Sequence, residues 1–82
     1  MRVLGAISIA ALLALATACR SSHDYLADAD RLFLAKKYPE AALIYRKAIQ
    51  KDPRSAEAYY KLGLAQRANG NYAAAYESFL AP

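Results

Sequence analysis

The pattern of hydrophobic residues changes at Cys19, the single cysteine of the chain. Residues 3–18 are uncharged and rich in Leu, Ala and Ile, and Arg2 is the only charged side chain before them. After Cys19, apolar residues recur at steps of three and four between charged residues, which is the period of an amphipathic helix. We therefore expect an apolar leader followed by an all-α remainder.

The first half of the remainder predicts two helices. Residues 24–36 carry apolar side chains on one stripe and predict the first helix. Pro39 fits the first turn of a second helix, because the N–H that proline lacks would have no partner there. Asp52-Pro53 ends this second helix, since the residue before a proline is kept out of the α region.

The second half of the remainder predicts two more helices. Ser55 is a residue favoured at the N-cap, and the third helix runs from there to about residue 68. Gly70 can adopt the left-handed conformation that closes a helix. A fourth helix is expected over 72–80.

The residues after Cys19 repeat with a period of 34. The pairs that align at this offset are Tyr25 with Tyr59, Ala29 with Gly63, Tyr38 with Tyr72, Ala41 with Ala75 and Tyr45 with Phe79. A fixed period of this length indicates stacked copies of one supersecondary unit. Two copies of a helical hairpin are therefore predicted.

The motifs of this period resemble the tetratricopeptide repeat, in which an aromatic residue precedes a Leu-Gly pair and Tyr, Ala, Phe and Pro follow. The second copy contains Tyr59-x2-Leu62-Gly63 and Ala75-x3-Phe79, and the first contains Tyr25, Ala29, Leu32, Ala41, Tyr45, Ala48 and Asp52-Pro53. Asp28 stands where the family has Leu, and Gln66 stands where it has Tyr. The resemblance implies a helix-turn-helix solenoid of about two repeats over 24–82, with repeat one at 22–55 and a partial repeat two at 56–82.

Residues 1–18 have the layout of a secretory signal, and their apolar run is shorter than the about 20 residues that span a bilayer. The stretch Leu15–Cys19 resembles the bacterial lipobox, although Ala16 stands where Leu is usual. This resemblance implies cleavage before Cys19, a lipid on its sulfur and a lipidated tether over 19–23. A permanent membrane span and an unlipidated secreted protein are the alternatives.

The residue that follows Cys19 indicates which membrane would hold the lipid anchor. In the lipoprotein family an Asp at this place tends to mark retention in the inner membrane, whereas this chain has Arg20. We therefore expect secretion across the inner membrane and a lipid anchor in the outer membrane, with the folded part facing the periplasm.

The remainder offers no group of residues for catalysis or metal binding. It contains one histidine, His23, and no cysteine beyond Cys19, and its carboxylates are spread over both repeats. Metal sites and active sites need several such groups close together. We expect no catalytic residue, no metal, no cofactor and no enzymatic activity.

The charge pattern argues against a nucleic-acid partner. Removing residues 1–18, which hold one Arg and no acid, lowers the formal net charge from +4 to +3. The remaining basic residues alternate with acids along the predicted helices, as they do on a solvated helix face. We expect no binding of nucleic acid.

The repeat resemblance also implies a binding surface. In such solenoids the first helices of successive hairpins line a concave groove, which holds extended or helical peptide segments. The lining residues that the resemblance implies are Leu26, Asp30, Phe33, Leu34, Tyr60, Leu64 and Arg67. We expect a lipid-anchored protein that binds a protein or peptide partner, or acts as a scaffold, in the bacterial cell envelope.

The number of repeats is smaller than a stable helical stack usually needs. Solenoids need about three repeats to bury a continuous core, and this chain carries about two. Phe79 and Leu80 are then expected on an unfinished surface. Either the sequence is a truncated piece of a longer array, or a second copy or a partner completes the stack. The alternative to a protein-binding adaptor is therefore a structural subunit, or a truncated fragment, of a larger tetratricopeptide envelope assembly or export complex.

Overall fold

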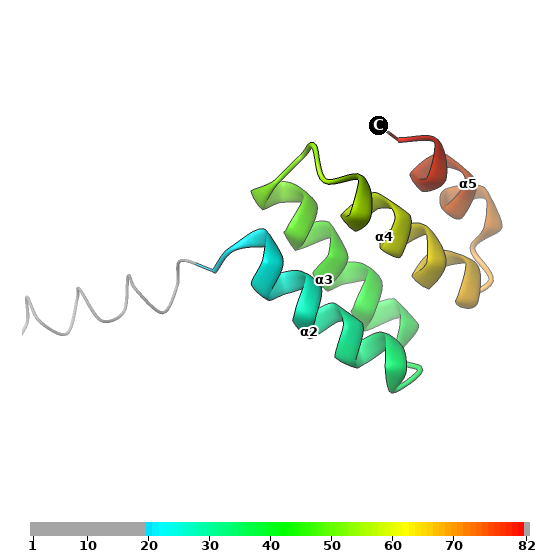
Figure 1. Ribbon diagram of the computed structural model, residues 1–82. Helices are drawn as coiled ribbons and strands as arrows, with labels where there is room; N and C mark the ends of the chain where they lie inside the picture. The colour runs from blue at the N-terminus through cyan, green and yellow to red at the C-terminus, as the bar shows by residue number, and fades with distance from the viewer. Residues whose placement is uncertain (1–19, 82) are drawn as a thin grey trace, which may run out of the picture.

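The computed structural model describes residues 20–81, and within this range it contains α-helices and no strands (Figure 1). The helices are α2 at Ser22–Leu34, α3 at Tyr38–Lys51, α4 at Ala56–Ala68 and α5 at Tyr72–Leu80. Each helix packs against the next one along the chain, so that two helical hairpins stand side by side. The predicted all-α fold is confirmed for this range.

The predicted signal at 1–18 and the lipidation site at Cys19 lie outside the described residues. The longest described helix, α3, has 14 residues, and no helix between residues 20 and 81 is long and apolar enough to cross a membrane. The signal and the lipid anchor therefore stay predictions.

Helix α2 begins two residues earlier than the sequence pattern predicts. The Ser21 hydroxyl accepts a hydrogen bond from the Asp24 N–H at 3.1 Å, and the Asp24 carboxylate accepts one from the Ser21 N–H at 3.2 Å. These bonds form a capping box, and they hold the pKa of Asp24 below its ordinary value. Ser22 and His23 are therefore helical, whereas the sequence analysis assigned them to the tether.

The two hairpin turns follow the same backbone path. The first helix ends two residues before the prediction, and Lys36 then adopts a left-handed conformation with φ of 62°. Gly70, 34 residues later, holds the same place with φ of 82°. In both turns the following N–H donates to a carbonyl of the preceding helix, over 2.9 Å in the first and 2.8 Å in the second. The sequence indicated this turn only at the glycine, because side chains disfavour the left-handed conformation.

The remaining helix boundaries agree with the prediction to within a residue. Pro39 lies in the first turn of α3, and Asp52 follows its end. Ser55 caps α4, where its hydroxyl accepts a hydrogen bond from the Ala58 N–H at 3.1 Å. Helix α5 covers the predicted range.

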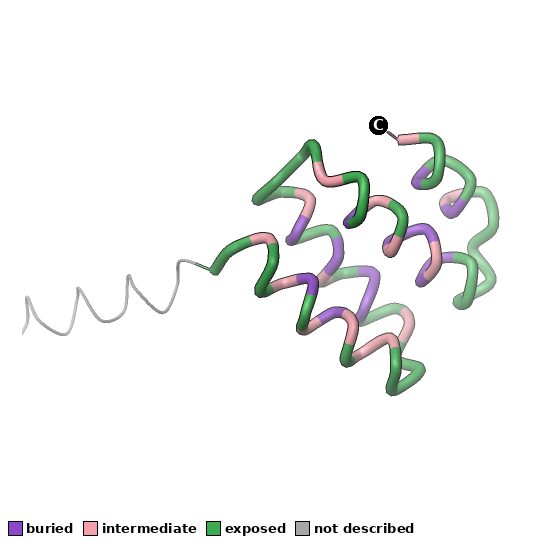
Figure 2. Tube along the Cα trace, viewed as in Figure 1, coloured by how far each residue is buried: buried purple, intermediate pink, exposed green. Residues whose placement is uncertain are grey.

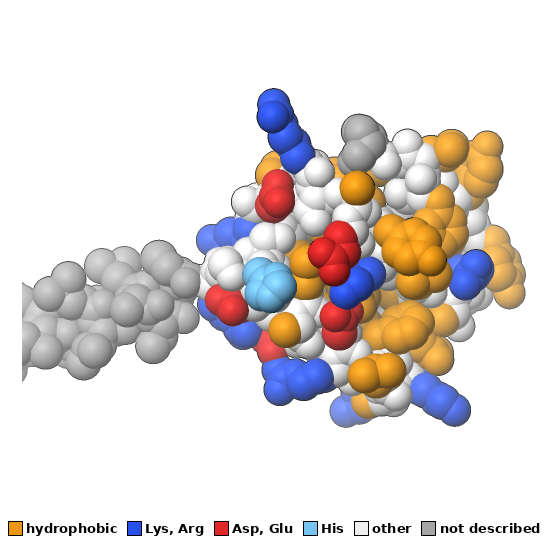
Figure 3. All heavy atoms as spheres, in the orientation of Figure 1, with side chains coloured by type: hydrophobic (Ala, Val, Ile, Leu, Met, Phe, Trp, Pro, Cys, Tyr) orange, Lys and Arg blue, Asp and Glu red, His pale blue; other side chains and the backbone are white. Residues whose placement is uncertain are grey.

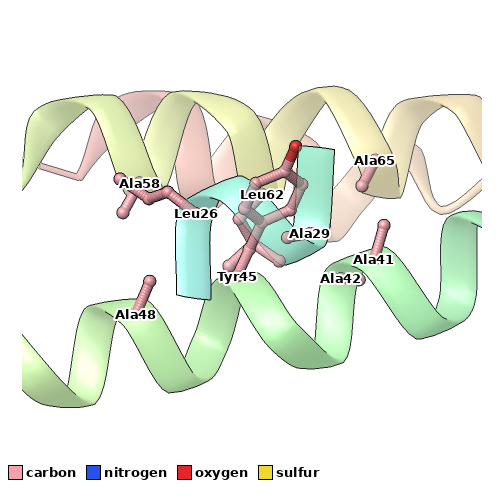
Figure 4. Close-up of a cluster of buried hydrophobic side chains, with 9 residues drawn as sticks. All are labelled: Leu26, Ala29, Ala41, Ala42, Tyr45, Ala48, Ala58, Leu62 and Ala65. Carbon is pink, nitrogen blue, oxygen red and sulfur yellow. The ribbon is translucent and has the colours of Figure 1, made fainter. Parts of the chain in front are cut away.

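A core of mostly small residues lies between α2, α3 and α4 (Figure 2, Figure 4). Its buried members are Leu26, Ala29, Ala41, Ala42, Tyr45, Ala48, Ala58, Leu62 and Ala65. Six of these nine residues are alanine, so the helix backbones can approach closely. Tyr45 is the largest fully buried side chain and reaches from α3 toward Leu62 of α4.

Helices α4 and α5 are held together by a close contact and a buried hydrogen bond. The Phe79 ring lies over Gly63, where an added Cβ atom would come within 2.6 Å of Phe79 Cδ1. The buried Ser78 hydroxyl donates to Oε1 of the buried Gln66 at 2.6 Å. A buried polar group without a partner is costly, so this pair specifies how α5 sits on α4.

Candidate functional site

The predicted groove residues belong to α2 and α4, and the side of the molecule that these two helices form is called the α2/α4 face. Figure 3 views this face, with acidic side chains toward the end where both helices begin. Hydrophobic side chains gather toward the other end and over α5. Two groups of residues organise the face, one polar and one aromatic.

The polar group centres on Asp30. Its carboxylate accepts hydrogen bonds from the Tyr45 hydroxyl at 2.5 Å and from the Lys61 ammonium at 2.8 Å. Lys61 also pairs with Glu57, one turn earlier on α4, at 3.2 Å. Because Asp30 lies on α2, Tyr45 on α3 and Lys61 on α4, this group joins the two hairpins.

The polar group changes the proton affinity of two members. Burial raises the pKa of Tyr45 above its ordinary value of 10.0, and the Asp30 carboxylate raises it further. Burial alone would lower the pKa of Lys61, but the hydrogen bonds and negative charges of Asp30 and Glu57 raise it overall. The Tyr45 hydroxyl and the Lys61 ammonium therefore stay protonated, and both remain hydrogen-bond donors at neutral pH.

The aromatic group consists of Tyr60, Phe79 and Arg67. The ring centroids of Tyr60 and Phe79 are 5.8 Å apart, and the Arg67 guanidinium lies 5.9 Å from the Phe79 centroid. Tyr60 is 57% exposed and Phe79 is 38% exposed, so both rings present surface to a partner. Gly63 permits this arrangement, because any side chain there would displace the Phe79 ring.

Three further residues that were predicted to line the groove are partly or fully exposed to solvent. Phe33 is half-buried and meets Tyr38 edge-on, with 5.2 Å between the ring centroids. Leu64 is half-buried on α4, and Leu34 is exposed at the end of α2. These three side chains therefore add apolar surface to the face.

Leu26 does not belong to the exposed face. It is only 6% exposed and lies in the buried cluster with Ala58 and Leu62 of α4. The prediction that Leu26 lines a groove is wrong, because the second hairpin covers this position of the first. Tyr60, 34 residues later, stays exposed because no further helix within residues 20–81 covers it.

The α2/α4 face also contains Glu57, Lys61 and Phe79, which were not predicted from the sequence. Glu57 and Lys61 stand four residues apart on α4, which is the spacing of a helical ion pair and could have indicated them. Phe79 was expected on an open end, but its pairing with Tyr60 depends on how α5 packs on α4. No sequence signal gives that pairing.

A separate hollow of about 410 Å³ lies on α2 and α3. It is lined by Asp28, Arg31, Leu32, Ala35, Lys37 and Ile44, none of which is a predicted groove residue. Asp28 accepts hydrogen bonds from both Arg20 and Arg31. Burial raises the pKa of Asp28, but the two guanidiniums outweigh it and hold that pKa below its ordinary value.

The chemistry of the α2/α4 face is that of a contact surface. Between residues 20 and 81, no three His, Cys, Asp or Glu side chains lie close enough to hold a metal ion. The face offers exposed aromatic rings, a guanidinium and hydrogen-bonding groups that are already oriented. Exposed aromatic and Arg side chains of this kind are enriched where proteins bind one another.

Comparison with known proteins gives one match. The sequence model of a family described as TPR repeat matches residues 29–70, which is 42 of the 82 residues. No curated protein and no solved structure matches the chain.

Proposed function

Because the chain belongs to the tetratricopeptide repeat family, we propose that it is a lipid-anchored protein of the bacterial cell envelope that binds proteins or peptides through its α2/α4 face. The repeats of this family are modules for protein–protein interaction and scaffolding. Such modules are typically not catalytic, and we extend this to the present chain, for which we propose no enzymatic activity.

The observation that carries the binding proposal is the aromatic group. Aromatic and Arg side chains are enriched among the residues that dominate binding energy at protein interfaces, and aromatic rings bury large areas while losing little rotamer freedom. Tyr60 is held against Phe79 and already has a defined orientation. Binding of a partner over this group therefore costs little ordering entropy.

Charge on the same face indicates the chemistry of the partner. Two carboxylates of this face, those of Asp30 and Glu57, are both engaged by Lys61. None of the ion pairs within residues 20–81 involves Arg67, which lies beside Phe79. We propose a segment that places an apolar side chain on Tyr60 and an acidic side chain near Arg67.

Photo-crosslinking in the native envelope tests the binding surface. Tyr60 is replaced by p-benzoylphenylalanine, and the control carries it at Leu43, an exposed residue of α3. A discrete protein adduct is expected at position 60 and not at position 43. Adding Arg67→Glu should lower its yield about threefold or more, because a surface charge contact contributes about 0.5–1 kcal/mol. Equal adducts at both positions would overturn the proposal.

The lipid anchor has its own test. The proposal is supported by Cys19, which directly follows an uncharged apolar run and small residues. Mass spectrometry of protein extracted from host membranes should show an N-terminal peptide that begins at Cys19 and carries acyl groups. A mass that retains residues 1–18 would exclude the anchor, and separation of inner and outer membranes tests the proposed outer-membrane location.

A second candidate function is that of a structural subunit in a larger envelope or export assembly. The observation that favours it is the exposed side of α5, where Tyr72, Tyr76 and Leu80 are largely open to solvent. Permanent subunits cover such surfaces with one another, whereas a transient adaptor needs only its binding face.

A further inference from the structure

The internal repeat shows which surface of α5 is left uncovered. Helix α3 and helix α5 hold equivalent places in the two hairpins, 34 residues apart. Under α4, Ala42 and Tyr45 of α3 are only 7% and 2% exposed. Their equivalents on α5, Tyr76 and Phe79, are 66% and 38% exposed. Within the described residues, this side of the hairpin's second helix is therefore covered in α3 and open in α5.

The open side of α5 is apolar. Tyr72, Tyr76 and Leu80 recur every four residues, and Phe79 falls beside them, so at 3.6 residues per turn these side chains share one side. Glu77 is the only charged residue of α5, and the helical spacing places it away from the centre of this side. From side-chain areas of about 150–250 Å² for aromatic residues, the open side exposes roughly 500 Å². That is a patch of the size that marks interaction sites.

The charges of α2 determine which surface of a second copy could cover this patch. Head-to-tail stacking would place the α2 of a second copy on α5, as α4 lies on α3. The α2 residue equivalent to the buried Leu62 is Asp28, which accepts hydrogen bonds from Arg20 and Arg31. Burying this charged group against apolar side chains would carry a large desolvation cost. The first hairpin thus ends in a charged surface that opposes head-to-tail growth.

We propose that two copies of this chain pair about a two-fold axis, with α5 packed antiparallel on α5 of the second copy. In such a pair each copy presents the same stripe, so the apolar surfaces match and no charged group needs to be buried at the centre. The pair would bury about 1,000 Å² in total, which is near the lower limit of specific interfaces. This pairing rests on the second candidate function, and its stripe shares Phe79 with the aromatic group of the α2/α4 face.

Cysteine crosslinking of the full chain in membranes tests the pairing. Tyr76→Cys places a thiol at the middle of the stripe, near the proposed axis, and Leu43→Cys is the control on α3. The parent chain, with Cys19 its only cysteine, gives the background. Oxidation should yield about tenfold more disulfide-linked dimer from Tyr76→Cys than from Leu43→Cys, because a disulfide needs Cα atoms within about 7 Å. Adding Tyr72→Glu should abolish the dimer, and adding Leu43→Glu should not.

Three results would overturn the proposal. Equal dimer yields from Tyr76→Cys and Leu43→Cys would show random collision. A crosslink of Tyr76→Cys to a chain of different mass would show that another protein covers α5. A crosslink that forms only when Tyr76→Cys chains are mixed with Asp24→Cys chains would show head-to-tail stacking. In each case the mass of the photo-crosslinked adduct at Tyr60 still reports on the α2/α4 face, because a second copy of this chain and a different protein give adducts of different mass.

Discussion

At the residue scale, Lys36 is the residue whose backbone conformation fits its side chain least well. It has φ of 62°, and Gly70 holds the same place in the second turn with φ of 82°. A residue with a Cβ atom pays roughly 1 kcal/mol in this conformation, whereas glycine adopts it freely. The two turns therefore provide an internal comparison of the same backbone with and without a side chain.

This comparison predicts that Lys36→Gly stabilises the fold. We expect the free energy of unfolding to rise by about 0.5–1 kcal/mol, since relief of the strain exceeds the added entropy of an unfolded glycine. Gly70→Ala should lower it by about 1 kcal/mol. Urea unfolding of the chain in mild detergent, followed by far-ultraviolet circular dichroism, measures both.

A neighbouring residue supplies the control for this prediction. Lys37 is also exposed but has φ of −91°, which any residue adopts. Lys37→Gly should therefore destabilise the protein slightly, because only the entropy of the unfolded chain changes. If both glycine variants lower the stability to the same extent, the left-handed conformation of Lys36 carries no strain.

At the element scale, the helices could be predicted closely from the sequence because their start and stop signals are local. Ser55 and Pro53 act on their immediate neighbours, so the pattern indicated the boundary between α3 and α4. The start of α2 was missed although Ser21 and Asp24 have the spacing of a capping box before an apolar stripe, which is also a local signal. Helix boundaries therefore depend on residues close in sequence.

The candidate site was less predictable because it depends on which positions the next hairpin covers. Leu26 and Tyr60 are equivalent in the repeat, yet one is buried and the other exposed. Their difference arises from the packing of α4 on the first hairpin and not from either residue type. The contact of Asp30 with Lys61 likewise joins residues 31 positions apart and follows from the same packing.

Helix α5 is predicted to open before the other helices. It has nine residues, no side-chain hydrogen bond at its N-cap, and α4 as its main packing neighbour. Helix α3 packs between α2 and α4 and should be the most protected. Hydrogen exchange followed by mass spectrometry should show α5 amides exchanging first, because local opening follows the number of buried contacts.

The Tyr72→Glu chain is the appropriate sample for this measurement, because the substitution keeps copies apart and removes any protection from pairing. Comparison with the parent chain at high concentration then reports on pairing itself. Amides of α5 that exchange as slowly as those of α3 in the Tyr72→Glu chain would contradict the prediction.

At the scale of the whole molecule, the polar group on Asp30 couples the two hairpins. Tyr45 donates to Asp30 from within the first hairpin, and Lys61 donates to it from the second. Loss of either donor leaves the carboxylate without one of its partners and weakens the contact between hairpins. Unfolding of the two hairpins should therefore respond together to conditions that remove these protons.

The resulting prediction is a loss of stability in alkali that depends on Tyr45. Burial and the Asp30 carboxylate raise the pKa of Tyr45 above 10.0, and the net pKa shift of Lys61 is also upward. Above about pH 10 the unfolded chain gives up protons that the folded chain retains, so the free energy of unfolding falls as pH rises. Each such proton contributes a slope of up to about 1.4 kcal/mol per pH unit, and below pH 10 the contribution is constant.

Two phenylalanine variants separate this effect from general alkaline unfolding. Tyr45→Phe should lose about 1 kcal/mol at neutral pH, because a buried hydrogen bond is removed, but its stability should fall less steeply above pH 10. Tyr72→Phe removes the same hydroxyl from an exposed tyrosine and should keep the slope of the parent chain. The measurement is the free energy of unfolding in urea at a series of pH values. Parallel curves for Tyr45→Phe and the parent would mean that the Tyr45 proton is not linked to folding, and that the Asp30 group does not couple the hairpins in this way.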